Sequence, residues 1–222
     1  MSAGAHAGTG SVTSQPNPFA SHWLIRDIVI ASHRAAVGPG SLLFVGDSLV
    51  EGFYWNRIAS LPVLNAGYSG IWTEALEPRI PLLLKSAEPS IAVLLVGTND
   101  AKKDCTESAL DGVAEHFETI IRHFEAAAVP VIVMTPPPVE RAKRLTNFYS
   151  ADALASLSRR IVQIADGRAA AIVDLHTAFG DGAGAGCQGL TTDGVHLSAG
   201  AYRQLHDVLE KTVAGVAMRR EQ

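Results

Sequence analysis

The chain has 222 residues, of which 47% are hydrophobic and 18% are charged, which suits one globular domain with a full apolar core. This composition excludes an intrinsically disordered chain, a collagen and a small disulfide scaffold. The 18 basic and 22 acidic residues give a net charge of -4, so we expect no basic face for nucleic acid or for an anionic membrane.

The N-terminal region lacks the basic segment and the apolar run of a signal peptide. We expect residues 1–20 to form a flexible tail and residues 21–222 to form a single domain. The apolar run Ala126–Val139 is broken by prolines and is shorter than the ~20 residues of a membrane span. Cys105 and Cys187 have no metal-ligand spacing, which predicts no structural zinc and fits a reducing compartment. The predicted location is cytoplasmic.

From Leu42 onward, short apolar runs alternate with stretches of helical periodicity, as in a parallel sheet that helices cover on both faces. A helix is expected before the sheet, around Ser21–Ala36. The predicted strands are Leu42–Val45, Pro62–Asn65, Ile91–Val96, Val131–Met134 and Ala171–Leu175. Apolar residues at spacings of three and four predict helices around residues 110–124, 154–164 and 205–213, the last with Ser198 as N-cap. The predicted fold is a three-layer α/β/α sandwich with a five-stranded parallel sheet.

Functional side chains in such a sheet gather beyond the carboxyl ends of the strands. Four segments fall at that predicted edge: Gly46-Asp47-Ser48-Leu49, Asn65-Ala66-Gly67, Gly97-Thr98-Asn99-Asp100 and Asp193-Gly194-Val195-His196. Asp47 and Asp100 are expected to bond the backbone of nearby turns.

Ser48 lies between a strand and a predicted helix, where free backbone N–H groups can bind an anion. A serine nucleophile needs a base, and His196 is the candidate, with Asp193 to fix its tautomer. The N–H groups of Ser48 and Gly67 and the side-chain amide of Asn99 are candidate donors to an oxyanion. A glycine at position 67 would also let a substrate approach the backbone closely. The predicted chemistry is acyl transfer to water.

These four segments, in this order, resemble the signature blocks of the SGNH or GDSL hydrolases, and the resemblance runs from Leu42 to the C-terminal helix. It implies a flavodoxin-like sandwich with strand order 2-1-3-4-5. It also implies that Ser48 is the nucleophile, that His196 and Asp193 complete the triad, and that the enzyme needs no metal or other cofactor. Members of this family resemble esterases, lipases, thioesterases and carbohydrate O-acetyl hydrolases.

Two other patterns offer rival sites. Asp174 and His176 form a second acid–base pair at the end of the fifth predicted strand. Residues 184–189 fit the GxGxxG pattern of dinucleotide sites, but they follow the last strand and open no helix, so we expect a loop there.

The substrate is predicted to be a small-molecule ester. No connection is long enough for a lid, which favours an open cleft and short acyl groups, such as acetyl esters of carbohydrates. Tyr54, Trp55 and Pro137 are candidate substrate contacts, with ordinary core packing as the alternative for the aromatic residues. Cleavage of lysophospholipids or acyl-CoA thioesters is the second hypothesis. A non-catalytic sugar-binding module is a remote third, because such a module would be expected to lose Ser48 or His196.

Overall fold

A computed structural model of the chain describes residues 17–220. Residues 1–16 of the predicted tail lie outside the described residues. The remaining residues of that tail lead directly into α1 (Ala20–Val37), which begins one residue before the predicted domain boundary. The side chain of Asn17 accepts a hydrogen bond from the N–H of Phe19 at this point (2.9 Å).

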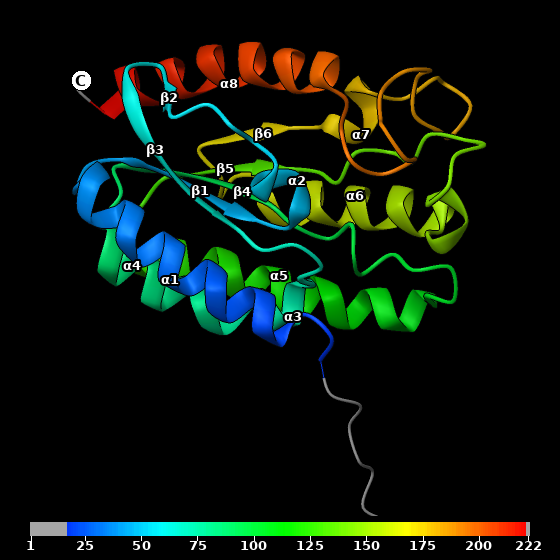
Figure 1. The fold of residues 1–222 in the computed structure, drawn as a ribbon, viewed down its shortest axis with the longest axis horizontal. Coiled ribbons are helices and arrows are strands. Elements are labelled where there is room, and N and C mark those ends of the chain that lie inside the picture. Colours follow the sequence, from blue (N-terminus) through cyan, green and yellow to red (C-terminus); the bar gives the residue numbers. More distant parts are fainter. Residues whose placement is uncertain (1–16, 221–222) are drawn as a thin grey trace, which may run out of the picture.

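The described residues form one sheet with the strand order β2-β3-β1-β4-β5-β6 (Figure 1). Its parallel strands are β1 (Leu42–Gly46), β3 (Leu61–Gly67), β4 (Ile91–Leu95), β5 (Val131–Met134) and β6 (Ala171–Val173). These are the five predicted strands in the predicted order, so the flavodoxin-like topology is confirmed.

The sheet also contains a sixth strand that was not predicted. β2 (Arg57–Ile58) pairs antiparallel with the start of β3. The turn between them is Ala59-Ser60, and both residues have positive φ (46° and 64°). A two-residue hairpin of this kind usually carries Asn or Gly, so its sequence gives no turn signal.

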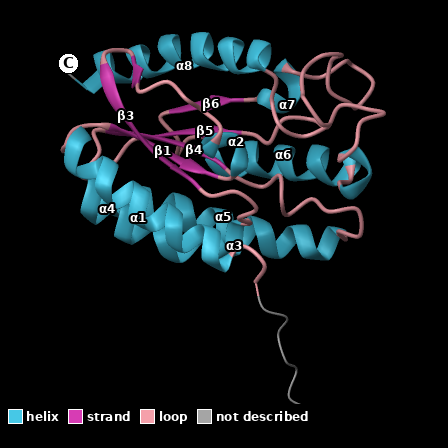
Figure 2. Ribbon diagram, viewed as in Figure 1, coloured by secondary structure: helices cyan, strands magenta, loops and turns pink. Residues whose placement is uncertain are grey.

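Helices cover both faces of the sheet (Figure 2). One face carries α1, α4 (Ile80–Ala87), α5 (Glu107–Ala126) and α6 (Ala151–Ala165), and the other carries α8 (Ala199–Arg220). Short helices lie at α2 (Ser48–Glu51), α3 (Thr73–Leu76) and α7 (Leu175–Ala178). The three helices predicted after the third strand are the central parts of α5, α6 and α8. Ser198 caps α8, since its Oγ accepts a hydrogen bond from the N–H of Ala201 (3.3 Å).

Alternation along β1 divides the core into two layers. Leu42 and Phe44 belong to the apolar cluster beneath α8, whereas Leu43 and Val45 belong to the cluster beneath α1, α5 and α6. All four side chains are fully buried. Because successive side chains of a strand point to opposite faces, a strand without a polar face has to be covered on both sides. None of the helices in residues 17–220 is long and apolar enough to cross a membrane.

Candidate active site

Ser48 is the first residue of α2, directly after β1. Asp47 caps this helix through its Oδ1, which accepts a hydrogen bond from the N–H of Leu49 (2.9 Å). The N–H of Ser48 makes no hydrogen bond to any residue between 17 and 220, as expected for the first turn of a helix. This turn therefore presents a hydroxyl together with a free backbone donor.

The loop before α8 brings His196 and Asp193 to Ser48. The Oγ of Ser48 lies 3.0 Å from Nε2 of His196, and Nδ1 of His196 lies 2.8 Å from Oδ2 of Asp193. Because the carboxylate accepts the Nδ1 proton, Nε2 is left to accept a proton from the serine. The side chain of His196 is 41% exposed, so the site is open to solvent.

Asp193 is held as an anion by its own turn. Its Oδ1 accepts hydrogen bonds from the N–H groups of Val195 (3.1 Å) and His196 (2.9 Å). Burial acts to raise the pKa of Asp193, but the hydrogen bonds from the His196 side chain and these two N–H groups outweigh it and lower the pKa. The carboxylate can therefore stabilise a positive charge that forms on His196.

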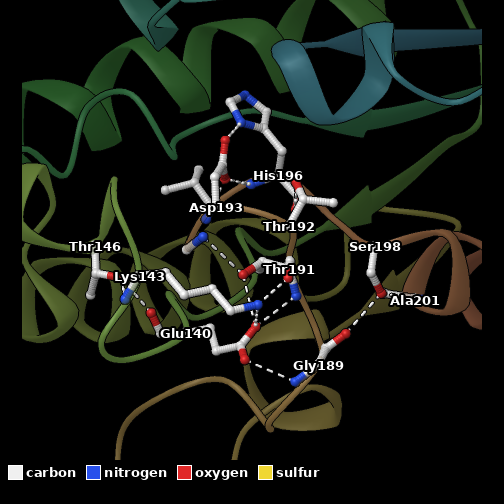
Figure 3. A network of polar contacts seen from close by, with 12 residues as sticks. Glu140, Lys143, Thr146, Gly189, Thr191, Thr192, Asp193, His196, Ser198 and Ala201 are labelled. Carbon is white, nitrogen blue, oxygen red and sulfur yellow. Dashed lines mark hydrogen bonds and ion pairs between the residues drawn. The ribbon is translucent and has the colours of Figure 1, made fainter.

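A buried carboxylate, Glu140, anchors the loop that carries Asp193 (Figure 3). Its carboxylate accepts hydrogen bonds from the N–H of Gly189 and from the N–H and the hydroxyl of Thr191, each at 2.8 Å. It also forms an ion pair with Nζ of Lys143 (2.8 Å). Burial acts to raise its pKa, but the contact with Lys143 and the bonds from the loop prevail, and the pKa falls to about 2.

Two backbone hydrogen bonds from the segment 140–145 also hold the loop that carries Asp193. The N–H of Leu145 donates to the carbonyl of Asp193 (2.8 Å), and the N–H of Glu140 donates to the carbonyl of Gly194 (3.0 Å). Gly194 has a φ of +111°, and a Cβ there would lie 2.5 Å from Oγ1 of Thr146. Sequence reasoning missed Glu140, because a single glutamate after a proline triplet gives no signal of this function.

Asn99 lies on the loop after β4, facing the turn that follows β3. Its Nδ2 donates one hydrogen bond to the carbonyl of Ile71 (3.0 Å). A side-chain amide has two N–H groups, so the second one can still donate to an oxyanion. Its Oδ1 lies near Lys102 and Tyr149, neither of which sequence reasoning singled out.

Gly67 has a different role from the one predicted. Its N–H already donates to Oδ1 of Asn65 (3.0 Å), and a Cβ at this position would lie 2.1 Å from the backbone nitrogen of Glu51. α2 therefore fills the space on the side of Gly67 where a Cβ would lie, and a substrate cannot approach from that side. The side chain of Asn65 also ties β3 to the end of α2, since its Nδ2 donates to the carbonyls of Val50 (2.7 Å) and Phe53 (2.8 Å).

In the turn after β3, Gly70 is a better candidate than Gly67 to donate its N–H to an oxyanion. It precedes Ile71, whose carbonyl accepts from Asn99, and its φ is +75°. Its N–H makes no hydrogen bond within the part of the chain that the structure describes.

Two buried carboxyl groups lie beneath the site. Burial raises the pKa of Asp47 and that of Asp100 to about 6. Asp100 accepts hydrogen bonds from the N–H (3.1 Å) and Oγ1 (3.0 Å) of Thr73 at the start of α3. Both aspartates thus bond the backbone of nearby turns, as expected from the sequence.

The rival patterns do not assemble a second site. Asp174 caps α7 through Thr177 and accepts from Oγ1 of Thr135 (2.8 Å), and no hydrogen bond joins it to the side chain of His176. The GxGxxG segment at residues 184–189 is a loop, as predicted. In residues 17–220, no group of three or more His, Cys, Asp or Glu side chains could hold a metal ion.

The candidate substrate contacts lie in different environments. Tyr54 is 63% exposed and stacks on Trp55 (ring centroids 4.0 Å apart), which in turn stacks on His206 of α8 (4.7 Å). Pro137 is buried, which leaves little of its surface for a substrate.

Comparison of this chain with known proteins identifies its family. The model of the GDSL-like lipase/acylhydrolase family matches residues 44–204, a range that includes Ser48, Asn99, Asp193 and His196. The chain belongs to this family. The resemblance seen in the sequence is thereby confirmed, and the protein is a carboxylic ester hydrolase, which removes the non-catalytic module from consideration.

Two curated relatives of this acylhydrolase share 26% identity with it. One is the thioesterase 1/protease 1/lysophospholipase L1 of Escherichia coli, matched over 61% of this chain and 69% of that protein. The other is the isoamyl acetate-hydrolyzing esterase of Saccharomyces cerevisiae, matched over 66% of this chain and 65% of that protein. A GDSL-like lipase structure from Bacteroides thetaiotaomicron has a TM-score of 0.72 at 20% identity, covering 88% of this chain and 99% of that one. At this identity the likeness supports the fold alone.

Proposed function

We propose that this acylhydrolase cleaves carboxylic esters with short acyl groups through an acyl-enzyme on Ser48. The observation that carries the proposal is the line of contacts from Ser48 Oγ to His196 Nε2 (3.0 Å) and from His196 Nδ1 to Asp193 (2.8 Å). Ser48 Oγ attacks the ester carbonyl carbon while its proton moves to Nε2 of His196. His196 then gives this proton to the departing alcohol oxygen, and the same base activates the water that releases the acid.

The oxyanion of each tetrahedral intermediate needs donors that are already in place. We assign this role to the N–H of Ser48 and the second N–H of the Asn99 amide. The N–H of Gly70 takes the place first given to Gly67, because the Gly67 N–H is already bonded to Asn65.

A short acyl group is supported by two observations. The side chains of His196 and Asp193 are 41% and 20% exposed, so these two residues can be reached directly from solvent. The yeast relative is named for hydrolysing isoamyl acetate, an ester with an acetyl group. Acetyl esters of carbohydrates belong to the same substrate class, and the exposed ring of Tyr54 offers a surface on which a sugar can stack.

Labelling with a fluorophosphonate probe tests the nucleophile. Wild-type protein should become labelled at neutral pH, and Ser48→Ala should lose the label while keeping the wild-type melting temperature. Ser32→Ala, which removes an exposed hydroxyl on α1, is the matched control and should be labelled like wild type. Labelling that survives in Ser48→Ala would exclude Ser48 as the nucleophile.

The alternative substrates are long-chain lysophospholipids and acyl-CoA thioesters, favoured by the name of the Escherichia coli relative. A series of p-nitrophenyl esters from acetate to palmitate, together with acetylated sugars and acyl-CoA, distinguishes the two. We expect kcat/KM to fall as the acyl chain lengthens. A rise toward palmitate would replace the short-acyl proposal by the alternative.

A further inference from the structure

Lys102 and Tyr149 form a polar triangle with Asn99, on the side of its carbonyl oxygen. Nζ of Lys102 lies 3.5 Å from Oδ1 of Asn99, and the hydroxyl of Tyr149 lies 3.3 Å from the same atom. Nζ of Lys102 also donates to the hydroxyl of Tyr149 (3.2 Å) and lies 4.3 Å from the centroid of its ring. Two donors, one of them a cation, therefore converge on one amide oxygen.

The backbone holds this triangle in register. Lys102 and Tyr149 form an isolated antiparallel β-bridge between the loop after β4 and the segment before α6. The N–H of Lys103 donates to the carbonyl of Phe148 (3.1 Å), and the N–H of Ser150 donates to the carbonyl of Ala101 (3.0 Å). The triangle thus joins two loops that are fixed relative to each other.

These contacts permit only one orientation of the Asn99 amide. Lys102 can only donate, so it has to face an acceptor, and the carbonyl of Ile71 can only accept, so it has to face a donor. Both conditions are met when Oδ1 points to Lys102 and Nδ2 points to Ile71. A rotated amide would place its NH₂ group against Lys102 and its oxygen against the carbonyl oxygen of Ile71.

Tyr149 is suited to donate to this oxygen. Burial raises the pKa of its phenol, with the negative charges of Asp47 and Asp193 acting in the same direction. The hydroxyl therefore keeps its proton at neutral pH, and its lone pair faces Lys102 while its proton faces Asn99.

We propose that Lys102 and Tyr149 are positioning residues of the oxyanion hole, which fix the Asn99 amide and strengthen its free N–H as a donor. A cation and a hydroxyl that pull electron density toward Oδ1 make the N–H groups of the same amide more positive, because hydrogen bonds in a chain polarise one another. Donors that are already oriented also need no rearrangement when the oxyanion forms. This inference rests on the proposed function, since it takes Asn99 to be an oxyanion donor.

The decisive experiment combines Lys102→Met with Asn99→Ala in a double-mutant cycle, with kcat and KM measured on p-nitrophenyl acetate. Removing an oxyanion donor costs about 10²- to 10³-fold in kcat, so losing part of its support should cost about tenfold. We expect Lys102→Met to lower kcat about tenfold with KM unchanged, and to weaken binding of a boronic acid, which forms a tetrahedral adduct on serine, in the same proportion. In the Asn99→Ala background, Lys102→Met should have no further effect on kcat, because the group it supports is gone.

Three further variants sharpen the result. Lys102→Arg keeps a cation and should restore most of kcat, and Tyr149→Phe should lower kcat in the same way as Lys102→Met. Lys103→Met removes the neighbouring exposed charge without touching Asn99 and should behave like wild type, which controls for a change in overall charge. Melting temperatures verify that each variant is folded.

Besides an unchanged kcat in Lys102→Met, two results would overturn the inference. The first is an equal loss of kcat for Lys102→Met with and without Asn99, which would make Lys102 act independently of the amide. The second is a rise in KM alone, which would make Lys102 a substrate contact. If wild type were not labelled by the fluorophosphonate probe, the proposed function itself would fail. Normal labelling together with an unchanged kcat in Lys102→Met would reject only the inference.

Discussion

The two carboxylate oxygens of Asp193 have separate roles. Oδ1 binds the N–H groups of Val195 and His196 and so shapes the turn, while Oδ2 binds Nδ1 of His196. A substitution that keeps one oxygen can therefore separate the structural role from the proposed catalytic one.

Asp193→Asn makes this separation. The amide oxygen can still accept from the turn, but the amide N–H₂ then faces Nδ1 of His196 and stabilises the wrong tautomer. We expect kcat on p-nitrophenyl acetate to fall by about 10⁴, the size of this change in a Ser-His-Asp triad, with little change in melting temperature. Asp193→Ala should lose kcat and also melt at a lower temperature, because the turn loses both bonds. A kcat for Asp193→Asn within tenfold of wild type would contradict the assigned role of Oδ2.

Single residues with a familiar chemistry and a fixed neighbour were predictable from the sequence. Ser48 after a strand, and Asp193 three residues before His196, indicated a triad because the chemistry needs those groups within reach of one another. Glu140 and Tyr149 were not predictable, because each contacts a loop that lies far from it in sequence. Lys102 lies only three residues after Asn99, but its contact with Tyr149, 47 residues away, gave no signal in the sequence. Their contacts depend on how the segment 139–150 folds back, and no periodic pattern encodes that.

At the scale of elements, Gly67 shows how closely α2 packs on β3. A Cβ at Gly67 would lie 2.1 Å from the nitrogen of Glu51 and 2.7 Å from the carbonyl carbon of Val50, both of them backbone atoms that cannot move aside alone. The polar contacts that Asn65 makes to the end of α2 depend on this approach.

We therefore expect Gly67→Ala to destabilise the fold by about 3 kcal/mol, at the upper end of overpacking costs, and to displace α2 together with Ser48. Gly112→Ala is the matched control, because Gly112 lies within α5 with no atom within 4 Å of a Cβ. That change should stabilise the protein by about 0.5–1 kcal/mol through helix propensity. Denaturant unfolding measures both. A Gly67→Ala protein as stable as wild type would show that α2 can shift without cost.

The sequence predicted regular elements better than short ones. A strand that is buried on both faces is apolar at every position, and a long surface helix repeats its apolar residues every three or four positions, so β4 and α5 were recognisable. β2 has two residues and a turn without Asn or Gly, and α3 has four residues, so neither has room for a period.

At the scale of the whole molecule, the segment 139–150 connects the two halves of the site. Glu140 and Leu145 hold the loop that carries Asp193 and His196, while Tyr149 contacts Asn99, the proposed oxyanion donor. Helix α1 holds α2, which carries Ser48, since Arg26 donates to the carbonyl of Gly67 (2.8 Å) and His22 lies 3.0 Å from Glu51 of α2. The spacing of the reacting groups is therefore set by contacts outside the sheet as well as by its edge.

The free energy of unfolding of the whole molecule should depend on pH, because its buried carboxyl groups titrate differently in the native and unfolded states. The pKa of Asp47 is raised to about 6, so the native state binds the proton more tightly than the unfolded state, and stability increases as the pH falls from about 6 to about 4. The pKa of Glu140 is lowered to about 2, so its contribution is present above its ordinary pKa of 4.5 and is lost as the pH falls toward 2.

The difference in unfolding free energy between each variant and wild type isolates one group, because the other titrations cancel. Asp47→Asn keeps an oxygen to cap α2 and removes the buried charge, so its stability relative to wild type should be about 2 kcal/mol higher at neutral pH than near pH 4. Glu140→Gln should show the opposite pH dependence. It should be less stable than wild type at neutral pH, and the difference should shrink as the pH falls from about 5 toward 2. Urea unfolding across this pH range measures both curves. Parallel curves for Asp47→Asn and wild type would mean that the carboxyl group beneath Ser48 is not charged and buried at neutral pH.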